Sequence, residues 1–338
     1  MGKVMENSYY ILTKEKVIIE RLHICTWEFP RASSYIEFGL EFPYDSFTDD
    51  YIEFYLAAPF IKKGDFFKCL QENLSNRENG RFIFNDVVRG IENVGDDPRD
   101  GSILNFETRG NITVLPCEAK AYKEYVLLKI KKPSKYKGSA YFRVLVKIEK
   151  NSIAINKKGI AKTTYIYDFK INETRNLPQS IYDLKKDKVL NICEVKNFFC
   201  LHIVPDSFMF SFIDSSKLKN IRKLESWSFQ KYLPDIKGIN RDCYNIIFLK
   251  DNNNSGKRSY SMFTMCTEEI IGFKQIALAI GANILCNLLF AFSSLRFAKD
   301  PQIEWYRQIP WEYWAALAIL LILCIYPFIP LIKKMFQK

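Results

Sequence analysis

Apolar and polar residues alternate with a period of two over much of the first 265 residues, which is typical of β-strands with one buried face. Ile36, Phe38 and Leu40 share one side of such a run, and Glu37 and Glu41 share the other. The same pattern predicts strands at 52–56, 125–132, 141–149, 164–171, 198–204, 208–212, 244–249 and 260–265. Only two short helices are predicted, at 64–74 and 219–233.

The order of these elements predicts the fold class of residues 1–265. Regular helices do not separate the strands, which argues against a parallel sheet with crossover helices. We therefore expect a mainly β domain, an antiparallel sandwich with a few short helices. A polar stretch with Pro178 marks a candidate subdomain break near 172–187.

The pattern changes near the C-terminus, where two long apolar runs occur. Residues 275–295 carry no charge and would span about 31 Å as a helix. Residues 311–332 carry one charge, Glu312, and are preceded by aromatic residues that membrane interfaces favour. The sequence therefore predicts a domain of residues 266–338 that forms a two-helix transmembrane hairpin, with helices at about 275–295 and 311–332.

The distribution of Lys and Arg predicts how this hairpin is oriented. Six basic residues flank its outer ends and three lie in its linker. The positive-inside rule then places residues 1–270 and the C-terminal tail in the cytoplasm, at the inner (plasma) membrane. An odd count of nine cysteines without a CxxC pair, and an N-terminus without an apolar run, agree with a reducing compartment.

One stripe of the first predicted helix is more polar than an anchor requires. Asn283 and Asn287 lie four residues apart, with Ala279, Phe290 and Ser294 close to the same face. Two interpretations stay open, namely hydrogen bonds between helices and the lining of a pore built from several copies.

Candidate chemistry is sparse. His23 and His202 both lie in apolar alternating runs and are predicted to be structural strand residues. Motifs for zinc, for a Ser-His-Asp triad or for a phosphate-binding loop do not occur. The acidic turn at 96–101 resembles a calcium loop, but Pro98 occupies a ligand position. We therefore predict a protein that is not an enzyme, with no metal and no cofactor.

Basic residues concentrate in one block, since residues 120–188 hold 18 basic and 6 acidic side chains. We predict a hairpin of strands 125–132 and 140–149 around a loop at 133–138. Alternation places Lys129, Lys131, Arg143 and Lys147 on its outward face, and Lys135 and Lys137 on its loop. Three interpretations stay open for these ligand-binding candidates: a solvated face, a surface for anionic lipid headgroups, and a site for a nucleotide or an oligonucleotide. Tyr122, Tyr125, Tyr136 and Tyr141 could stack on bases, and the second-choice cations are Lys157, Lys158, Lys162, Lys185, Lys186 and Lys188.

This layout, a basic β-rich domain followed by a C-terminal apolar hairpin, resembles bacterial anti-phage membrane effectors, above all the channel subunit of Hailong-type defence systems. The resemblance implies a tetrameric channel whose gating responds to a DNA oligomer made by a partner nucleotidyltransferase. The expected function is thus an oligomeric membrane pore, gated by an anionic nucleotide or oligonucleotide, that acts in abortive antiviral defence by membrane disruption. The alternative is a membrane-anchored binding or scaffold protein that does not conduct.

Overall fold

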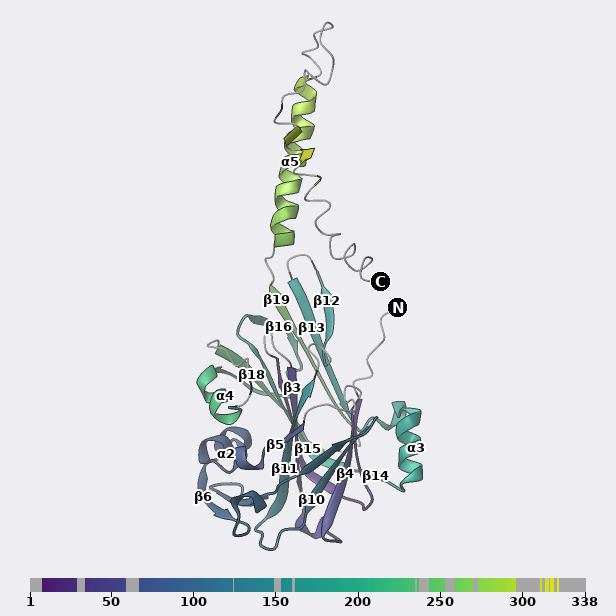
Figure 1. Cartoon of the computed structure of the whole chain (residues 1–338), viewed down its shortest axis with the longest axis vertical. Helices are drawn as coiled ribbons and strands as arrows, with labels where there is room; N and C mark the ends of the chain where they lie inside the picture. The colour runs from purple at the N-terminus through teal and green to yellow at the C-terminus, as the bar shows by residue number, and fades with distance from the viewer. Residues whose placement is uncertain are drawn as a thin grey trace. The chain divides into compact units, whose positions relative to one another are not determined.

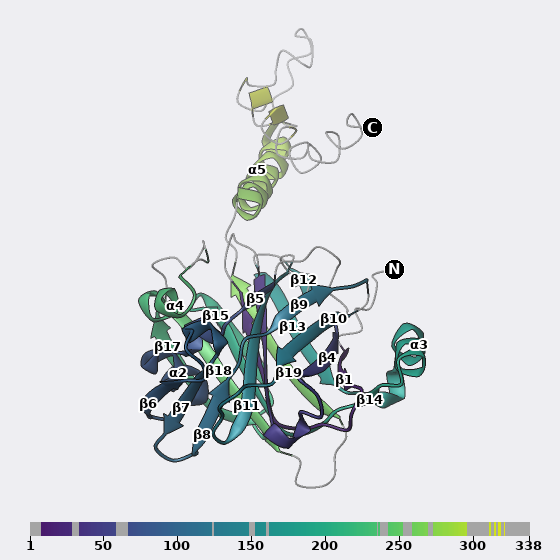
Figure 2. The same cartoon turned by 60° about the horizontal axis from the view of Figure 1, so that its bottom comes forward.

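The computed structural model describes a β-rich protein with short helices on the outside of its sheets (Figures 1 and 2). The described residues are 8–28, 34–58, 67–123, 125–148, 153–159, 162–234, 236, 243–252, 259–269 and 273–295, with single positions at 311, 314, 315, 317, 318 and 321. The chain divides into two compact units. The β-rich unit comprises Met1–Lys157 and Thr164–Glu268, and the second unit comprises Lys158–Thr163 and Glu269–Lys338.

The first sheet, here called the β1 sheet, has nine strands within the described residues. Along its main path they follow the order β16 (Phe208–Ile213), β19 (Tyr260–Glu269), β13 (Lys162–Ile171), β1 (Ser8–Thr13), β4 (Tyr51–Ala57), β10 (Val126–Lys131) and β9 (Glu118–Ala121). The short strands β12 (Ile155–Lys158) and β14 (Asn191–Ile192) pair with β13 and β1.

The second sheet, here called the β2 sheet, has ten strands within the same ranges. Their order is β17 (Leu218–Glu225), β18 (Cys243–Asn252), β15 (Glu194–Pro205), β2 (Ile18–Trp27), β3 (Ser34–Phe42), β11 (Ser139–Ile148), β8 (Asn111–Val114), β7 (Ser102–Phe106) and β6 (Val88–Asn93), with β5 (Phe67–Cys69) also paired to β11.

The predicted mainly β architecture is confirmed, and strands occur at all the predicted positions. The prediction of a purely antiparallel sandwich is wrong, because β1 pairs with β13, β2 with β15 and β11 with β8 in parallel. Alternation along a strand reports which face is buried, and it carries no information about the direction of the neighbouring strand.

The main core lies between the two sheets, where the alternating apolar residues of both meet. Phe54, Leu128 and Phe169 of the β1 sheet and Phe38 and Phe142 of the β2 sheet belong to it, each at most 1% exposed. Burial of this continuous layer is the main driving force that holds the sandwich together.

Helices cover parts of both outer faces. On the β1 sheet, α3 (Gln179–Asp187) buries Ile181 against Tyr10, Leu12 and Tyr55. On the β2 sheet, α1 (Gln71–Leu74), α2 (Arg77–Phe84) and α4 (Ser226–Tyr232) pack on a second cluster that includes Trp27. Figures 1 and 2 show α3 on one side of the sandwich and α2 with α4 on the other.

Both predicted helices are partly wrong. Residues 64–74 include β5 as well as the single turn of α1, and residues 219–233 form most of β17 before α4 begins at Ser226. In both places an apolar spacing that suits a helix is satisfied by a strand followed by a short helix. The predicted break at 172–187 lies inside the β-rich unit and contains α3 and the short 3-10 turn Thr174–Asn176.

Among the described residues, no helix is long and apolar enough to cross a membrane. The prediction of a transmembrane hairpin, and with it the inner-membrane location and orientation, is therefore wrong. The helix α5 (Phe273–Leu295) occupies the first predicted segment. Its described part includes the amides of Asn283 and Asn287, and Asn287 Nδ2 donates a hydrogen bond to Asn283 Oδ1 at 3.0 Å. The second predicted segment, 311–332, lies outside the described residues except at six positions.

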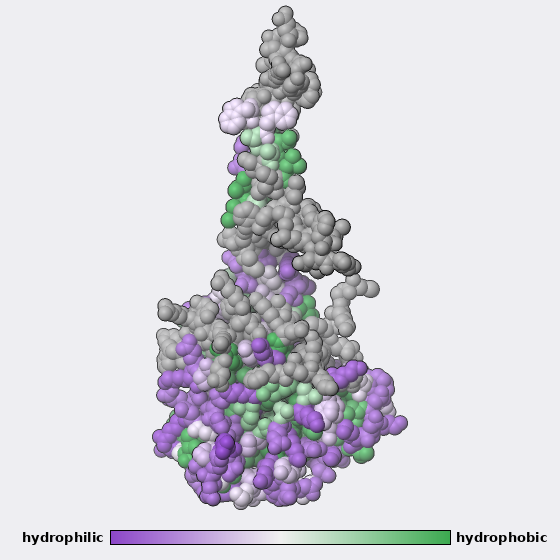
Figure 3. All heavy atoms as spheres, viewed as in Figure 1, coloured by the Kyte–Doolittle hydropathy of each residue, from purple (hydrophilic) through white to green (hydrophobic). Residues whose placement is uncertain are grey.

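Surface composition differs between the two units. On the side of the β-rich unit seen in Figure 3, hydrophilic residues cover most of the surface and apolar residues gather in its middle. In the described part of α5, apolar side chains such as Ile276, Leu278 and Leu285 are exposed.

Candidate functional site

The cationic residues predicted from the sequence do not form one surface. Lys129 and Lys131 lie on β10, which pairs with β4 and β9 of the β1 sheet. Arg143 and Lys147 lie on β11, which pairs with β3, β5 and β8 of the β2 sheet. The predicted hairpin is therefore wrong, because residues 132–138 connect the two sheets instead of folding one strand back on the other.

Arg143 is a core residue and its predicted outward position is wrong. It points away from the inter-sheet core, as alternation predicts, but this outer face is covered and the side chain is 0% exposed. Its guanidinium pairs with the equally buried Glu37, which also accepts hydrogen bonds from Trp27 Nε1 at 2.7 Å and from Tyr232 OH at 2.9 Å. A charge that is fully buried and paired with a buried carboxylate in this way is a structural element and not a ligand site.

The five remaining predicted cations, Lys129, Lys131, Lys135, Lys137 and Lys147, are here called the lysine surface. Lys135 and Lys137 pair with Glu92 at 3.5 and 2.7 Å. The Lys129 ammonium lies 3.9 Å from the centroid of the Tyr51 ring. Lys131 and Lys147 are exposed on different sheets. The predicted site thus consists of separate cations, three of which already have partners.

The structure also locates three other groups of predicted residues. Tyr136 stacks on Tyr44 at 3.3 Å and Tyr122 on Tyr125 at 4.8 Å, so these rings occupy one another, and Tyr141 is buried. In α5, Ala279, Asn283 and Asn287 are exposed, whereas the side chains of Phe290 and Ser294 lie outside the described residues. The second-choice lysines are spread over β12, β13, α3 and the turn after it.

A groove on the outer face of the β2 sheet gathers cations that the sequence analysis did not select. It consists of two hollows of about 810 and 220 Å³ that share Asn85 and Phe248 in their walls. We call it the α2 groove, because α2 and the turn after it form one wall and strands β15, β17 and β18 form the other. Its volume lies in the range of small-molecule sites.

The floor of the α2 groove is apolar. Leu201 of β15, Leu224 of β17 and Ile246 and Phe248 of β18 line the larger hollow together with Phe82 and Ile83 of α2. The Phe199 and Phe248 rings are nearly parallel, with planes at 11°, but their centroids are 5.9 Å apart, so they are less closely stacked on each other than the two tyrosine pairs. These side chains project here because alternate residues of neighbouring strands point to the same face of a sheet.

Three cations from three strands meet at the smaller hollow: Arg21, Lys219 and Lys250. Arg21 and Lys250 lie 5.9 and 5.4 Å from the centroid of the Phe199 ring. Partial burial, and then the nearby charges of Lys219 and Arg21, lower the pKa of Lys250. Neither Lys219 nor Lys250 forms an ion pair with any described residue. An anion bound here would relieve the mutual repulsion of these groups.

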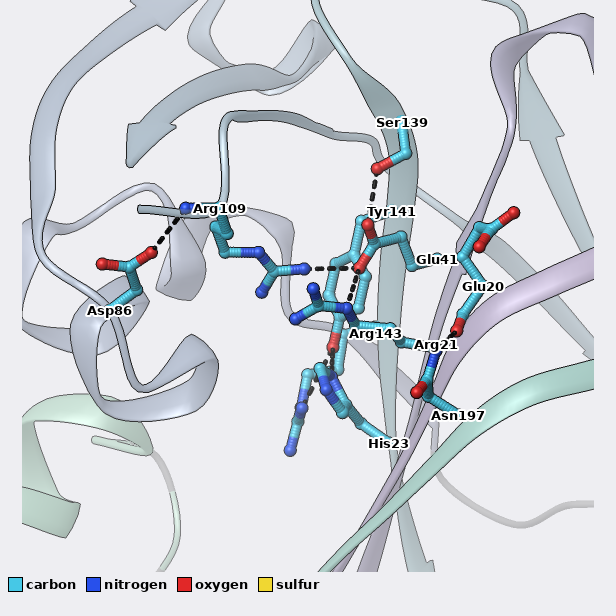
Figure 4. A network of polar contacts seen from close by, with 10 residues as sticks. All are labelled: Glu20, Arg21, His23, Glu41, Asp86, Arg109, Ser139, Tyr141, Arg143 and Asn197. Carbon is cyan, nitrogen blue, oxygen red and sulfur yellow. Dashed lines mark hydrogen bonds and ion pairs between the residues drawn. The ribbon is translucent and has the colours of Figure 1, made fainter. Parts of the chain in front are cut away.

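A polar network behind the floor holds Arg21 and the loop at 108–109 (Figure 4). Glu41 accepts a hydrogen bond from Arg109 Nη2 at 2.6 Å and one from Ser139 Oγ at 2.7 Å. Arg21 Nε lies 3.6 Å from the same carboxylate. Two buried or partly buried arginines thus share one acid, so this end of the groove keeps a positive excess.

Asp86 ties the loop to the end of α2. Its carboxylate accepts hydrogen bonds from Thr108 Oγ1 at 2.7 Å and from the Arg109 backbone N–H at 3.0 Å. Burial raises the pKa of Asp86, but hydrogen bonds from Thr108 and from the backbone outweigh it, so the pKa lies below its usual range. The other acid of the groove, Glu78, pairs with Lys231 at 2.9 Å. Both carboxylates of the groove are therefore occupied.

Three polar side chains form the wall beside Phe248. Asn85 ends α2 in the left-handed conformation, with φ of 52°, a conformation that Asn adopts more readily than most residues. Arg222 Nη2 donates to Asn85 Oδ1 at 3.3 Å across the groove. With its amide oxygen turned toward the guanidinium, Asn220 accepts from Arg222 Nη2 at 3.2 Å and from Nε at 3.3 Å. Arg222 therefore joins the two walls.

The histidines occupy the structural positions predicted for them. His23 is buried on β2 behind the floor, with its ring 5.1 Å from that of Phe199 and Nδ1 3.0 Å from Tyr141 OH. His202 is buried in the inter-sheet core, 2.5 Å from Thr26 Oγ1. Within the described ranges, no group of acidic, His and Cys side chains is arranged to hold a metal ion.

Sequence patterns alone could not identify the α2 groove. Arg21, Lys219 and Lys250 lie on three strands that are separated in the chain, and only the strand of Lys219 carries further Lys and Arg residues, Arg222 and Lys223. The one local signal is the alternation of Asn220, Arg222 and Leu224, which a helix prediction for 219–233 concealed. No model of a known protein family matches the chain, and no curated protein matches it either.

Proposed function

We propose that this protein is a binding protein for an anionic ligand that carries a planar ring, such as a nucleotide or a short oligonucleotide, and that the ligand occupies the α2 groove. The observation that carries the proposal is the meeting of Arg21, Lys219 and Lys250 beside the nearly parallel rings of Phe199 and Phe248.

The cationic end is suited to phosphate. Hydrogen bonds between charged partners are shorter and stronger than neutral ones, and Arg and Lys are the residues that most often bind phosphate. Lys219 and Lys250 have no acidic partner among the described residues, so no described carboxylate competes with a ligand for them. Partial burial of Lys250 and Arg21 also reduces screening by salt.

The apolar floor is suited to a base. Proteins that bind single-stranded nucleic acid combine a positive groove with aromatic side chains on which bases stack. Phe248 lines both hollows and Phe199 lines the cationic one, so one ligand can place its phosphate on the cations and its ring against Phe248 and the apolar floor.

The groove supports binding rather than catalysis. Its two carboxylates are occupied by Lys231 and by the loop at 108–109, and no His or Cys is among the described residues that line it. Lysines are the remaining groups of the groove that acid–base or nucleophilic chemistry can use, and here they lie beside other cations, an arrangement suited to holding an anion. Oligomerisation, a partner nucleotidyltransferase and a role in anti-phage defence stay predictions of the family resemblance.

Fluorescence anisotropy with a labelled single-stranded 8-mer tests the proposal. The double variant Lys219→Gln/Lys250→Gln should bind roughly 100-fold or more weakly, since it removes two charged hydrogen bonds that each contribute about 1.5 kcal/mol or more. The slope of log affinity against log salt should fall by about 0.7 for each lost phosphate contact.

The matched control is Lys131→Gln/Lys147→Gln, which removes the same charge from the lysine surface and should change affinity less than twofold. Equal affinity and an equal salt slope for wild type and the Lys219/Lys250 variant would overturn the proposal. Equally tight binding of poly-aspartate would show that the groove binds anions without using its aromatic floor.

A further inference from the structure

We infer that the α2 groove selects a planar ring whose edge presents neighbouring hydrogen-bond acceptors, such as the O6 and N7 of guanine, over a ring that presents an amino group, such as adenine. Arg222, with Asn85 and Asn220, is the specificity-determining group. The inference rests on the proposed function, since it concerns the ring of the same ligand.

The register of β17 and β18 places this group at the edge of a bound ring. Asn220 is the direct cross-strand partner of Phe248, and Arg222 is the partner of Ile246. Cross-strand partners stand side by side on one face of the sheet. A ring stacked on Phe248 therefore directs one edge toward Asn220 and Arg222.

The unused hydrogen-bonding capacity of this wall consists mainly of donors. The Arg222 guanidinium uses Nη2 and Nε toward the two amide oxygens of Asn85 and Asn220. Its Nη1 group and the Nδ2 groups of both amides have no partner in the part of the chain that the structure describes. Arg carries no acceptor, and each amide oxygen already accepts a hydrogen bond.

An edge with two acceptors pairs with such a wall, whereas an amino group meets another donor. Guanine is recognised by two donors directed at O6 and N7, which here would be Arg222 Nη1 and an amide Nδ2 of Asn85 or Asn220, and a two-donor contact of this kind discriminates between bases by roughly five- to 150-fold. An adenine amine at the position of O6 would leave donors facing each other, which weakens binding further.

Isothermal titration calorimetry with two 5′-phosphorylated dinucleotides, one of guanosine and one of adenosine, tests the inference. The wild type should bind the guanosine dinucleotide at least fivefold more tightly. Inosine keeps O6 and N7 and should bind like guanosine, whereas 7-deazaguanosine lacks N7 and should lose most of the preference.

Three variants separate ring recognition from phosphate binding. Arg222→Gln should bring the guanosine-to-adenosine ratio close to one. Asn85→Gly should reduce the ratio and still permit the left-handed backbone at this position. Lys219→Gln/Lys250→Gln should weaken both ligands by the same factor and keep the ratio. The charge control is Lys223→Gln, because Lys223 pairs with Asp206 at 3.2 Å and does not line the groove.

The outcomes distinguish the inference from the proposed function. If no dinucleotide binds, both are overturned. If both dinucleotides bind through Lys219 and Lys250 with a ratio near one, the proposed function stands and this inference is wrong. The inference is also wrong if Arg222→Gln and Asn85→Gly, each folded by circular dichroism, keep the wild-type ratio.

Discussion

The lysine surface and the α2 groove are both cationic, but they differ in how their charges are used. On the lysine surface, two lysines share Glu92 and a third lies on the Tyr51 ring. In the groove, Lys219 and Lys250 have no acidic partner among the described residues and lie close enough to Arg21 for the lysine charges to affect each other. A high local density of lysines in the sequence therefore does not identify the surface with the most available charge.

The arrangement of strands explains the difference. Strands β10 and β11 are consecutive in the chain but belong to opposite sheets, so their side chains cannot build one face. Strands β17, β18, β15 and β2 are neighbours in the β2 sheet. In the chain they are widely separated, since β2 begins at Ile18 and β18 ends at Asn252. Proximity in a sheet thus brings together cations that the sequence separates.

The largest expected effect concerns Arg143, which the sequence assigns to the cationic surface and the structure assigns to the core. Arg143→Gln should lower the free energy of unfolding by about 3–5 kcal/mol, because it leaves the buried Glu37 carboxylate without its cation. Lys147→Gln, on the same strand but exposed, should change it by less than about 0.5 kcal/mol. Urea denaturation followed by circular dichroism measures both. Equal free energies of unfolding for the two variants would contradict the buried position of Arg143.

The second prediction concerns pH and His23, which lies behind the groove floor. Burial, and then the charges of Arg143, Arg109 and Arg21, lower the pKa of His23 well below its usual value. Below about pH 6.5 the His23 imidazole is protonated in the unfolded chain but not in the folded one. The contribution of neutral His23 to the free energy of unfolding is therefore fully present above about pH 6.5 and falls as the pH drops. The loss should approach about 1.4 kcal/mol per pH unit for this one group.

Urea denaturation between pH 7 and pH 5 measures this slope. His23→Gln should make it shallower than in wild type. His202→Gln is a second test, because burial in the inter-sheet core lowers the pKa of His202 to about 3, and this variant should also make the slope shallower. Lys147→Gln, on the lysine surface, should leave the slope unchanged. A slope unaffected by His23→Gln would mean that this imidazole is not buried in the neutral form.

The smallest expected effect tests whether the lysine surface is occupied by its own acids. Hydrogen bonds from Lys137 and Asn105 lower the pKa of Glu92 to about 2, so this carboxylate is charged at neutral pH. Glu92→Gln frees Lys135 and Lys137, and affinity for a single-stranded 8-mer should rise by less than about threefold, with a steeper dependence on salt. Anisotropy titrations measure this change. A gain larger than the loss caused by Lys219→Gln/Lys250→Gln would reverse the ranking of the two regions.

The sequence predicted strands well and short helices poorly. The strands at 36–42 and 125–132 both have a strict period of two, but only the second keeps one buried face, because helices and neighbouring elements cover the outer face of the first as well. The segment 219–233 has apolar residues at both strand and helix spacings. Hydrogen bonding to β18 makes it a strand as far as Glu225. The C-terminal runs were interpreted from length and hydropathy alone, an interpretation that the described part of the structure does not support.

By itself, the sequence determined the mainly β architecture, the buried faces of its strands and the structural character of both histidines, because these follow from local alternation of polar and apolar side chains. Only the tertiary structure decided which strands are neighbours, which faces the helices cover, and hence that Arg143 is buried while Arg21, Lys219 and Lys250 meet. The physical reason is that alternation fixes the face of a residue, whereas pairing between distant strands, which depends on the packing of the whole core, fixes its neighbours.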